Sequence, residues 1–240
     1  METEYERATE ASSGPRAITA EASVGETPIH FETGRIAKQA DGSVIVTCGE
    51  SKVLVTACGA RDSKGAVPFL PLTVEFREVS AAAGKIPGGF FRREGRPATE
   101  ATLSARMIDR PIRPLFPKGY NYETQVIALV LSYDQEHPTD ILGINGTSIA
   151  LSMSNIPWDG PIGAVRMGYY EDQLIVNPTE NQIDNGLLNL VVVGKKDGIL
   201  MVEAGVLELD EDIILDALVM AQQGIATIIA AQETMIRQVA

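Results

Sequence analysis

The residues with the clearest chemical potential lie in one glycine-rich window, which reads GKIPGGFFRREGRP. Phe90 and Phe91 are adjacent there, and Arg92, Arg93 and Arg96 follow them closely. Aromatic rings stack on bases, at about 1–3 kcal/mol per base, and guanidinium groups pair with phosphate oxygens. The window therefore favours binding of single-stranded nucleic acid by stacking and charge. On the residues alone, an equally good alternative is that one phenylalanine fills the core while the arginines form surface ion pairs.

The charge of the chain is unevenly distributed. The 240 residues carry a formal net charge of −12, which alone argues against a nucleic-acid-binding protein. Residues 85–118, however, hold eight of the twenty lysines and arginines and only three acids, so this window carries +5 and the rest of the chain −17. A basic patch on an acidic body attracts phosphates locally while the remainder keeps the protein soluble.

Arg106 and Arg110 are four residues apart in a segment with a helical pattern, so they share one face of that helix. Arg113 follows shortly after. The structural interpretation is an ion-pair cluster with Asp109 and Glu100. The functional interpretation is that these arginines support an active site formed by another part of the protein.

The remaining reactive side chains indicate no metal centre. Cys48 and Cys58 lie in strand-like segments and are expected to be two buried, unpaired thiols, as in a reducing compartment. His30 and His137 are isolated, so no zinc site is expected. The acids between Glu208 and Asp212 fit a helix start better than a metal site.

No signal for a membrane is found in the sequence. The chain begins with polar and acidic residues. We expect no apolar run to approach the roughly 18 residues that span a bilayer. We therefore expect no membrane partner and a cytoplasmic protein.

The elements that must position these residues follow from hydrophobic periodicity. Strands are predicted at 17–22, 28–31, 43–48, 52–58 and 71–79, and further hairpins pair 163–170 with 173–177 and 187–193 with 199–203. Residues 124–132 are almost uninterruptedly apolar, which predicts a strand buried on both faces.

The helices are predicted from breakers and apolar faces. The first begins near Pro97, after a loop at residues 83–95, and ends at Pro111 and Pro114. An apolar, buried helix is predicted at 140–154, and a long helix with one apolar face from about Asp210. This mixture predicts an α+β domain over 17–240 with a mixed or antiparallel sheet packed against helices. Residues 1–16 read as a disordered extension.

Long strings of the chain resemble the polynucleotide phosphorylase family. They include KIPGGFFRREGRP, ATLSARMIDRPIRPLFPKGY, FETGRIAKQADGSVIVTCGESKVLVTA, DILGINGTSIALSMSNIPWDGPIGAVRMG and GKKDGILMVEAG. The resemblance covers roughly residues 17–240, in order. These residues resemble the first of the two ribonuclease PH-like domains in that family.

The resemblance implies a fold, a substrate and partners. It implies a ribonuclease PH-like domain in a homotrimeric ring, in contact with a second such half and with RNA-degradation machinery. Phe90, Phe91, Arg92 and Arg93 would then grip single-stranded RNA at a constriction of the central channel, with Arg96 supporting the same path. The whole enzyme would degrade mRNA from its 3′ end with inorganic phosphate, releasing nucleoside diphosphates.

The resemblance also implies that the chemistry belongs to the other half of the enzyme. There, a Gly-Ser-Ser turn binds phosphate, and an acidic pair with a lysine holds Mg²⁺. In this chain the turn reads GINGTS. Thr147 and Ser148 keep hydroxyl groups that can contact a phosphate, but the favoured alternative is that they face a buried helix start. Ile183, Asn189 and Val191 occupy the expected positions of the acids and the lysine, and such side chains do not hold a hard cation.

The residues leave three functional interpretations. The first is the RNA-binding, ring-forming half of a phosphorolytic 3′-to-5′ exoribonuclease, inactive as an isolated chain, with neither catalytic nor metal-binding residues of its own. The second is a stand-alone ribonuclease PH-like exonuclease acting on transfer-RNA ends, against which the missing acidic pair and the aromatic–arginine loop count. The third is a catalytically inactive RNA-binding ring subunit.

Overall fold

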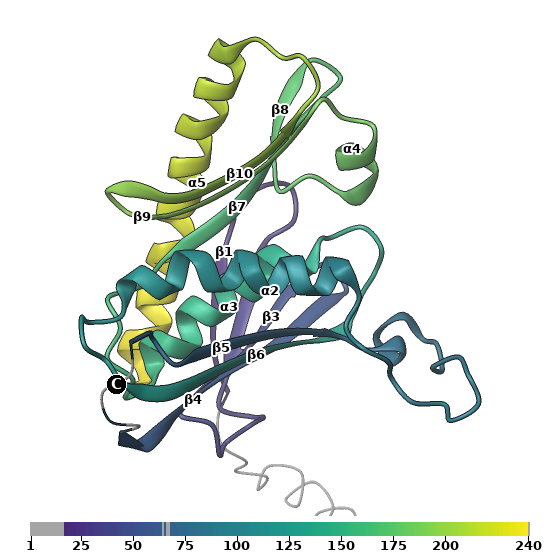
Figure 1. Cartoon of the computed structure of the whole chain (residues 1–240). Coiled ribbons are helices and arrows are strands. Elements are labelled where there is room, and N and C mark those ends of the chain that lie inside the picture. The colour runs from purple at the N-terminus through teal and green to yellow at the C-terminus, as the bar shows by residue number, and fades with distance from the viewer. Residues whose placement is uncertain (1–16, 64, 66–67, 240) are drawn as a thin grey trace, which may run out of the picture.

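Two β-sheets joined by helices make up the protein (Figure 1). The computed structural model describes residues 17–63, 65 and 68–239. The expected disordered extension at 1–16 lies outside the described residues. The α+β class with a mixed sheet is confirmed.

The first sheet has six strands in the order β1-β2-β3-β4-β6-β5. All neighbours are antiparallel except β5 and β6, which are parallel. The strands span Ile18–Ala22 (β1), Ile29–Thr33 (β2), Gly42–Cys48 (β3), Ser51–Ser63 (β4), Leu72–Glu78 (β5) and Tyr122–Ser132 (β6). Gly49 turns β3 into β4 with a φ of 57°, a conformation that glycine adopts without strain. The pairing of Cys48 with Ser51 keeps the two cysteines apart.

The expectation for β6 was wrong in one respect. Its buried and more exposed residues alternate, so only one face packs against the core. Val126, Ala128 and Val130 point inward, while Leu131 is 39% exposed. An uninterrupted apolar sequence does not by itself distinguish a strand covered on both faces from one with a half-open outer face.

Two helices cover the inner face of this sheet (Figure 1). Helix α3 (Thr139–Met153) packs on β3 and β4, and twelve of its fifteen residues are buried, as predicted. Helix α2 (Thr99–Ile112) packs on β5 and α3. Pro111 lies inside its last turn, and a short 3₁₀ turn, η2 (Arg113–Leu115), follows. A second 3₁₀ turn, η1 (Ser80–Ala83), leads from β5 toward α2.

The second sheet is antiparallel with the order β10-β9-β7-β8. It confirms both predicted hairpins and consists of β7 (Gly163–Tyr170), β8 (Gln173–Val176), β9 (Leu188–Lys195) and β10 (Gly198–Val206). The short helix α4 (Glu180–Asp184) was not predicted. Thr179 begins it with a capping box, in which its side chain accepts from the Gln182 backbone and the Gln182 side chain accepts from Thr179 N–H.

Helix α5 (Glu211–Val239) runs along both sheets and contacts β1, β7 and β9 (Figure 1). Acids in its first turn, Glu211 and Asp212, confirm the predicted helix start. Contrary to expectation, α5 is by length and composition apolar enough to cross a membrane. Here its inward residues, among them Ala221, Ile225 and Ile228, are buried against the sheets.

Buried polar groups fix α3 between β7 and α5. The Asn145 side chain donates to the Ala164 carbonyl at 2.9 Å and accepts from Ala164 N–H at 2.8 Å. Ser148 Oγ donates to Gln232 Oε1 at 2.7 Å and accepts from Ile162 N–H at 2.9 Å. Because every partner is satisfied, these bonds join the two sheets without the cost of an unpaired buried group.

Candidate nucleic-acid interface

A long loop between η1 and α2 projects from the body of the protein (Figure 1). Gly84 and Gly89 adopt φ values of 66° and 91°, the left-handed region in which a side chain would be strained. No atom lies within 4 Å of where a Cβ would stand on Gly84, Gly88 or Gly89. The glycines therefore serve the turns of the loop rather than close packing.

Phe90 and Phe91 form the apolar tip of this loop. Their side chains are 95% and 78% exposed, so neither ring fills the core, and that alternative is wrong. The two rings contact each other edge to face, with centroids 5.3 Å apart and planes at 86°. Exposed aromatic rings of this kind are available to stack on planar ligands such as bases.

The arginines of the loop are exposed, and their guanidinium groups have no partner among the described residues. None of the Arg92, Arg93 and Arg96 guanidinium groups forms a hydrogen bond or ion pair within the described part of the chain, so the surface ion pairs of the structural alternative are not formed. The one acid among them, Glu94, bonds instead to Ser80, whose N–H lies 2.8 Å from Glu94 Oε1. Glu94 thus ties the loop to η1 and leaves the three guanidinium groups open to an external anion.

Helix α2 arranges the other arginines differently from the expected cluster. Arg110 pairs with Glu203 of β10 at 2.9 Å, whereas Asp109 pairs with Arg113 at 2.7 Å. Arg106 is exposed and has no partner in the described residues. Of the expected cluster of Arg106, Arg110 and Arg113 with Asp109 and Glu100, only the pair of Arg113 with Asp109 is formed among the described residues.

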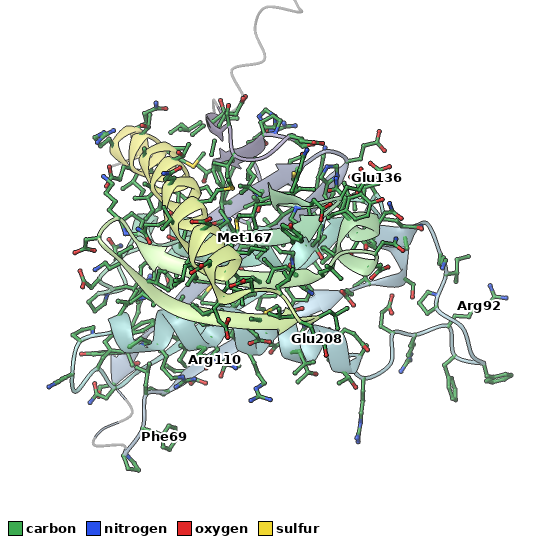
Figure 2. The ribbon with its side chains drawn as sticks, turned by 90° about the horizontal axis from the view of Figure 1, so that it is seen from above. Phe69, Arg92, Arg110, Glu136, Met167 and Glu208 are labelled. Atoms are coloured by element: carbon green, nitrogen blue, oxygen red, sulfur yellow. The ribbon has the colours of Figure 1, made fainter. Side chains whose placement is uncertain are left out.

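The basic window is not one patch. Arg92 lies on the loop at one end of α2, and Phe69 lies beyond its other end (Figure 2). Lys118 shares a surface hollow with Phe69 at that far end. The free positive charge of the loop is thus separated from that of Lys118 by the length of the helix, roughly 20 Å at 1.5 Å per residue.

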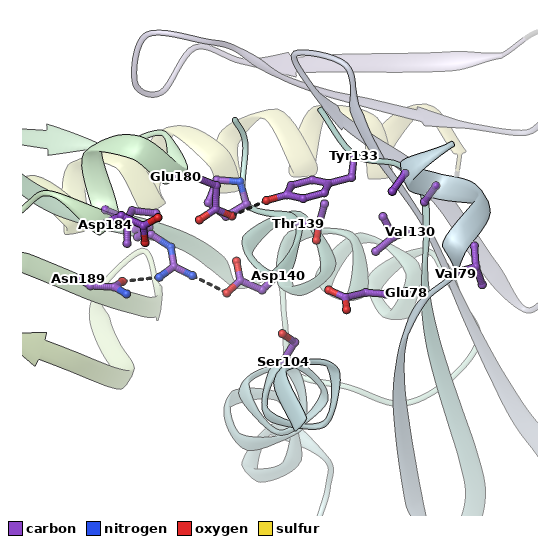
Figure 3. Close-up of a pocket in the computed structure, with 15 residues that line it drawn as sticks. Glu78, Val79, Ser104, Val130, Tyr133, Thr139, Asp140, Glu180, Asp184 and Asn189 are labelled. Carbon is purple, nitrogen blue, oxygen red and sulfur yellow. Dashed lines mark hydrogen bonds and ion pairs between the residues drawn. The ribbon is translucent and has the colours of Figure 1, made fainter. Parts of the chain in front are cut away.

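A cavity lies beside the root of the loop, where the two sheets meet (Figure 3). Pro138 and Thr139 at the start of α3 line it, together with Ile183 of α4 and Asn189 of β9. The helix start that faces this cavity is therefore Pro138–Thr139. Thr147 and Ser148 are buried, as expected, but they lie in the middle of α3 rather than at its start. They bond to the Gly143 carbonyl and to Gln232.

The arginine that lines this cavity is already paired with a carboxylate of the protein. Arg166 of β7, 8% exposed, donates to Asp140 in the first turn of α3 and to Asn189. The Asp140 carboxylate therefore occupies the place that a phosphate would need beside Arg166 and the helix N-terminus. Val191 is buried in β9, and no cluster of acids, histidines or cysteines suited to a metal ion occurs among the described residues.

One polar cluster was missed by sequence reasoning. Asp134 accepts from His137 Nδ1 at 2.7 Å, and His137 Nε2 lies 3.1 Å from Thr27 Oγ1. Asp134 also accepts from Ser51 Oγ at 2.9 Å and Glu50 N–H at 3.0 Å. These bonds tie three loops together. The pair Asp134 and His137 is spaced by only three residues, which was the one signal in the sequence.

The chain belongs to the 3′ exoribonuclease family. Residues 26–157 match the family's domain 1 and residues 160–224 match its domain 2. The boundary between the two matched regions falls between the six-stranded and the four-stranded sheet.

Within that family the chain is similar to polyribonucleotide nucleotidyltransferases. It is 54% identical over 202 residues to the one from Thermomicrobium roseum, covering 84% of this chain and 26% of that relative. It is 50% identical over 226 residues to the one from Thermus thermophilus, covering 94% and 32%. The chain thus spans about a quarter to a third of the length of these relatives.

The fold is also that of a solved structure, rice Rrp46. The two superpose with a TM-score of 0.68 over 95% of this chain and 99% of that one, at 14% sequence identity. Together with the family match, this likeness confirms the ribonuclease PH-like fold.

Proposed function

We propose that this chain is the RNA-binding, ring-forming first half of a phosphate-dependent 3′-to-5′ exoribonuclease. The observation that carries the proposal is the projecting loop. Two aromatic rings face solvent there, with three arginines whose guanidinium groups have no partner in the part of the chain that the structure describes. The similarity to polyribonucleotide nucleotidyltransferases supports RNA as the ligand.

The loop combines two kinds of attraction that suit a single strand. Phe90 and Phe91 stack on bases of any identity, because every base has an aromatic face. Arg92, Arg93 and Arg96 neutralise phosphates along the strand. The acidic remainder of the protein repels RNA, so the strand is held at the loop rather than over the whole surface.

The chemistry of the whole enzyme belongs to a second ribonuclease PH-like half. In the proposal that half binds inorganic phosphate and Mg²⁺, and three subunits form a ring that degrades mRNA in the cytoplasm with other RNA-degradation proteins. Arg106, which has no partner within the described residues, and Arg110 lie on an exposed face of α2 and are candidates to support that active site.

A second candidate function is a catalytically inactive RNA-binding ring subunit. The cavity beside the loop favours this second function for the isolated chain. Asp140 already pairs with Arg166, and no group of side chains suited to a metal ion occurs in the described residues. We expect the purified chain to release no nucleoside diphosphate from poly(A) with phosphate and Mg²⁺. Phosphorolysis that follows this protein through purification would contradict the assignment of the chemistry to the other half.

The RNA-binding role is tested by the salt dependence of affinity. The double variant Arg92→Ala/Arg93→Ala should bind a labelled oligo(A) more weakly and with a flatter salt slope, because each neutralised phosphate on a single strand contributes about −0.7 to that slope. The matched control is Arg35→Ala/Lys38→Ala, which removes the same charge on the loop between β2 and β3. Equal losses in the two variants would show general charge attraction and contradict binding at the loop.

A further inference from the structure

The cavity at the junction of the two sheets has the size and walls of a ligand site, and none of the aromatic or arginine residues of the projecting loop lines it. Its volume is about 480 Å³, within the usual range for small-molecule sites of about 300–1,000 Å³. Strands of both sheets, η1 and helices α2, α3 and α4 all contribute residues. Val79, Ala82, Val130 and Ile183 supply an apolar part of the wall.

Carboxylates dominate the polar part of this wall. Glu78, Asp140, Glu180 and Asp184 line the cavity, against Arg166 as its one cation (Figure 3). Arg166 is already neutralised by Asp140. Glu180 accepts a hydrogen bond from the neutral Tyr133 hydroxyl at 2.9 Å, which leaves its charge uncompensated.

Two titratable groups report the resulting negative potential. Burial, together with the charges of Glu100 and Asp140, raises the pKa of the Glu78 carboxyl. Burial and the hydrogen bond to Glu180 raise the pKa of the Tyr133 hydroxyl, and the charges of Glu180, Asp134 and Glu78 raise it further. The pKa values of both groups are raised because they are poorly solvated and lie near negative charges. A bound cation would relieve that repulsion.

The shape of the site selects the kind of cation. In the described part of the chain, no three acidic, histidine or cysteine side chains converge closely enough to hold a metal ion. The carboxylates instead come from separate elements, β5, α3 and α4, around a wall that is partly apolar. A ligand that satisfies them needs positive groups held apart by an aliphatic stem.

From these observations we infer that the cavity binds a small organic cation of the diamine or polyamine class. Its ammonium groups pair with Glu180 and Asp184 at one side and Glu78 at the other, while its methylene stem lies along the Tyr133 ring and Val130 (Figure 3). Phosphate is excluded by the same charges. The wall formed by Val79 and η1 is also the root of the projecting loop, so the bound cation contacts the segment from which that loop departs.

Calorimetric titration of the whole chain with putrescine and spermidine, at about 0.15 M salt to screen weak surface attraction, tests the inference. The variant Glu180→Gln/Asp184→Asn should weaken binding by about tenfold or more. A glutamine oxygen still accepts from Tyr133, so the fold is kept. The matched control Glu211→Gln/Asp212→Asn removes two charges at the start of α5 and should leave affinity unchanged.

The inference is overturned if neither amine binds, or if the pocket variant and the control variant lose affinity equally, since that would indicate attraction to net charge alone. Saturable binding of MgCl₂ that is lost in the pocket variant would also overturn it, because the site would then be a metal site. In support, methyl NMR signals of Ile183 and Val130 should shift on addition of spermidine and not on addition of MgCl₂. RNA binding is not required for any of these results, so the proposed function stands or fails separately.

Discussion

Cys48 and Cys58 have the same chemistry and opposite surroundings. Cys48 is buried, and burial together with the charge of Asp134 raises the pKa of its thiol to about 11. Cys58 is exposed, contrary to the expectation that both thiols are buried. At pH 8 we therefore expect a thiol reagent to modify one cysteine rapidly in the native protein and the second only after unfolding. In the variant Cys58→Ser the rapid reaction should disappear; equal rates for both thiols would contradict the assignment.

Asp134 stabilises the fold through its ionised form. Burial raises the pKa of this carboxyl, but hydrogen bonds from the His137 and Glu136 backbone and from the His137 and Ser51 side chains outweigh burial and hold the pKa far below 3.8. A carboxyl whose pKa is lowered by folding contributes stability above its unfolded pKa, and this contribution is lost as the pH falls.

The variant Asp134→Asn should therefore unfold at lower urea concentration at pH 7, with a loss of about 1.5–3 kcal/mol for a bond network to a charged group. The difference from the native protein should shrink as the pH falls below about 4. Asp197→Asn, in the turn between β9 and β10, is the control and should have little effect. A difference that is as large at pH 3 as at pH 7 would show that charge is not the cause.

At the residue scale the sequence grouped the loop residues, whose role in RNA binding stays a prediction, but it did not reveal the buried network. Phe90, Phe91 and the three arginines are recognisable because they are neighbours along the chain. Asp134 and His137 are close in sequence, but their other partners come from distant positions: Thr27 is separated from His137 by 110 residues and Ser51 from Asp134 by 83. Only the pairing of β1 through β6 brings them together, so no local pattern records the contact.

Helix α3 packs so closely on the first sheet that one of its residues has to be glycine. A Cβ on Gly146 would stand 2.5 Å from Val55 Cγ2 and 2.9 Å from Val46 Cγ2. Helix propensity alone favours alanine over glycine by about 1 kcal/mol, whereas overpacking a core costs about 1–3 kcal/mol.

Because the contact with Val55 is well below any real van der Waals distance, we expect overpacking to prevail. After the helix-propensity gain is subtracted, Gly146→Ala should lower the free energy of unfolding by up to about 2 kcal/mol in urea denaturation. Gly205→Ala is the control, since a Cβ there meets nothing within 4 Å. A more stable Gly146→Ala protein would mean that the sheet moves away at little cost.

The hairpins and long helices were predictable because their periodicity is local. The limits of prediction were set by tertiary context. Strand β4 continues to Ser63, beyond the expected end at residue 58, because its last residues pair with the start of β6. Helix α4 was missed because its five residues carry no apolar period and it depends on a capping box. The buried face of β6 depends on which side α3 covers.

In the whole molecule, the negative charge is concentrated outside the projecting loop. The body carries most of the negative charge, while the loop extends beyond it (Figure 2). The loop carries exposed rings and guanidinium groups that have no partner within residues 17–63, 65 and 68–239. The two sheets, fixed by the polar contacts around α3, provide a rigid base for that extension. This arrangement explains how a protein with a net charge of −12 can present a surface for a polyanion.

The central claim is that Phe90 and Phe91 bind RNA and do not stabilise the fold. The most direct measurement compares oligo(A) affinity and thermal unfolding of Phe90→Ala/Phe91→Ala with those of the native chain. Loss of two stacked rings should weaken binding by about 2–6 kcal/mol, because stacking contributes about 1–3 kcal/mol per base. The salt slope should be nearly unchanged because no charge is removed. The midpoint of thermal unfolding should stay the same, since both rings are exposed. Normal RNA affinity with a midpoint several degrees lower would contradict the account.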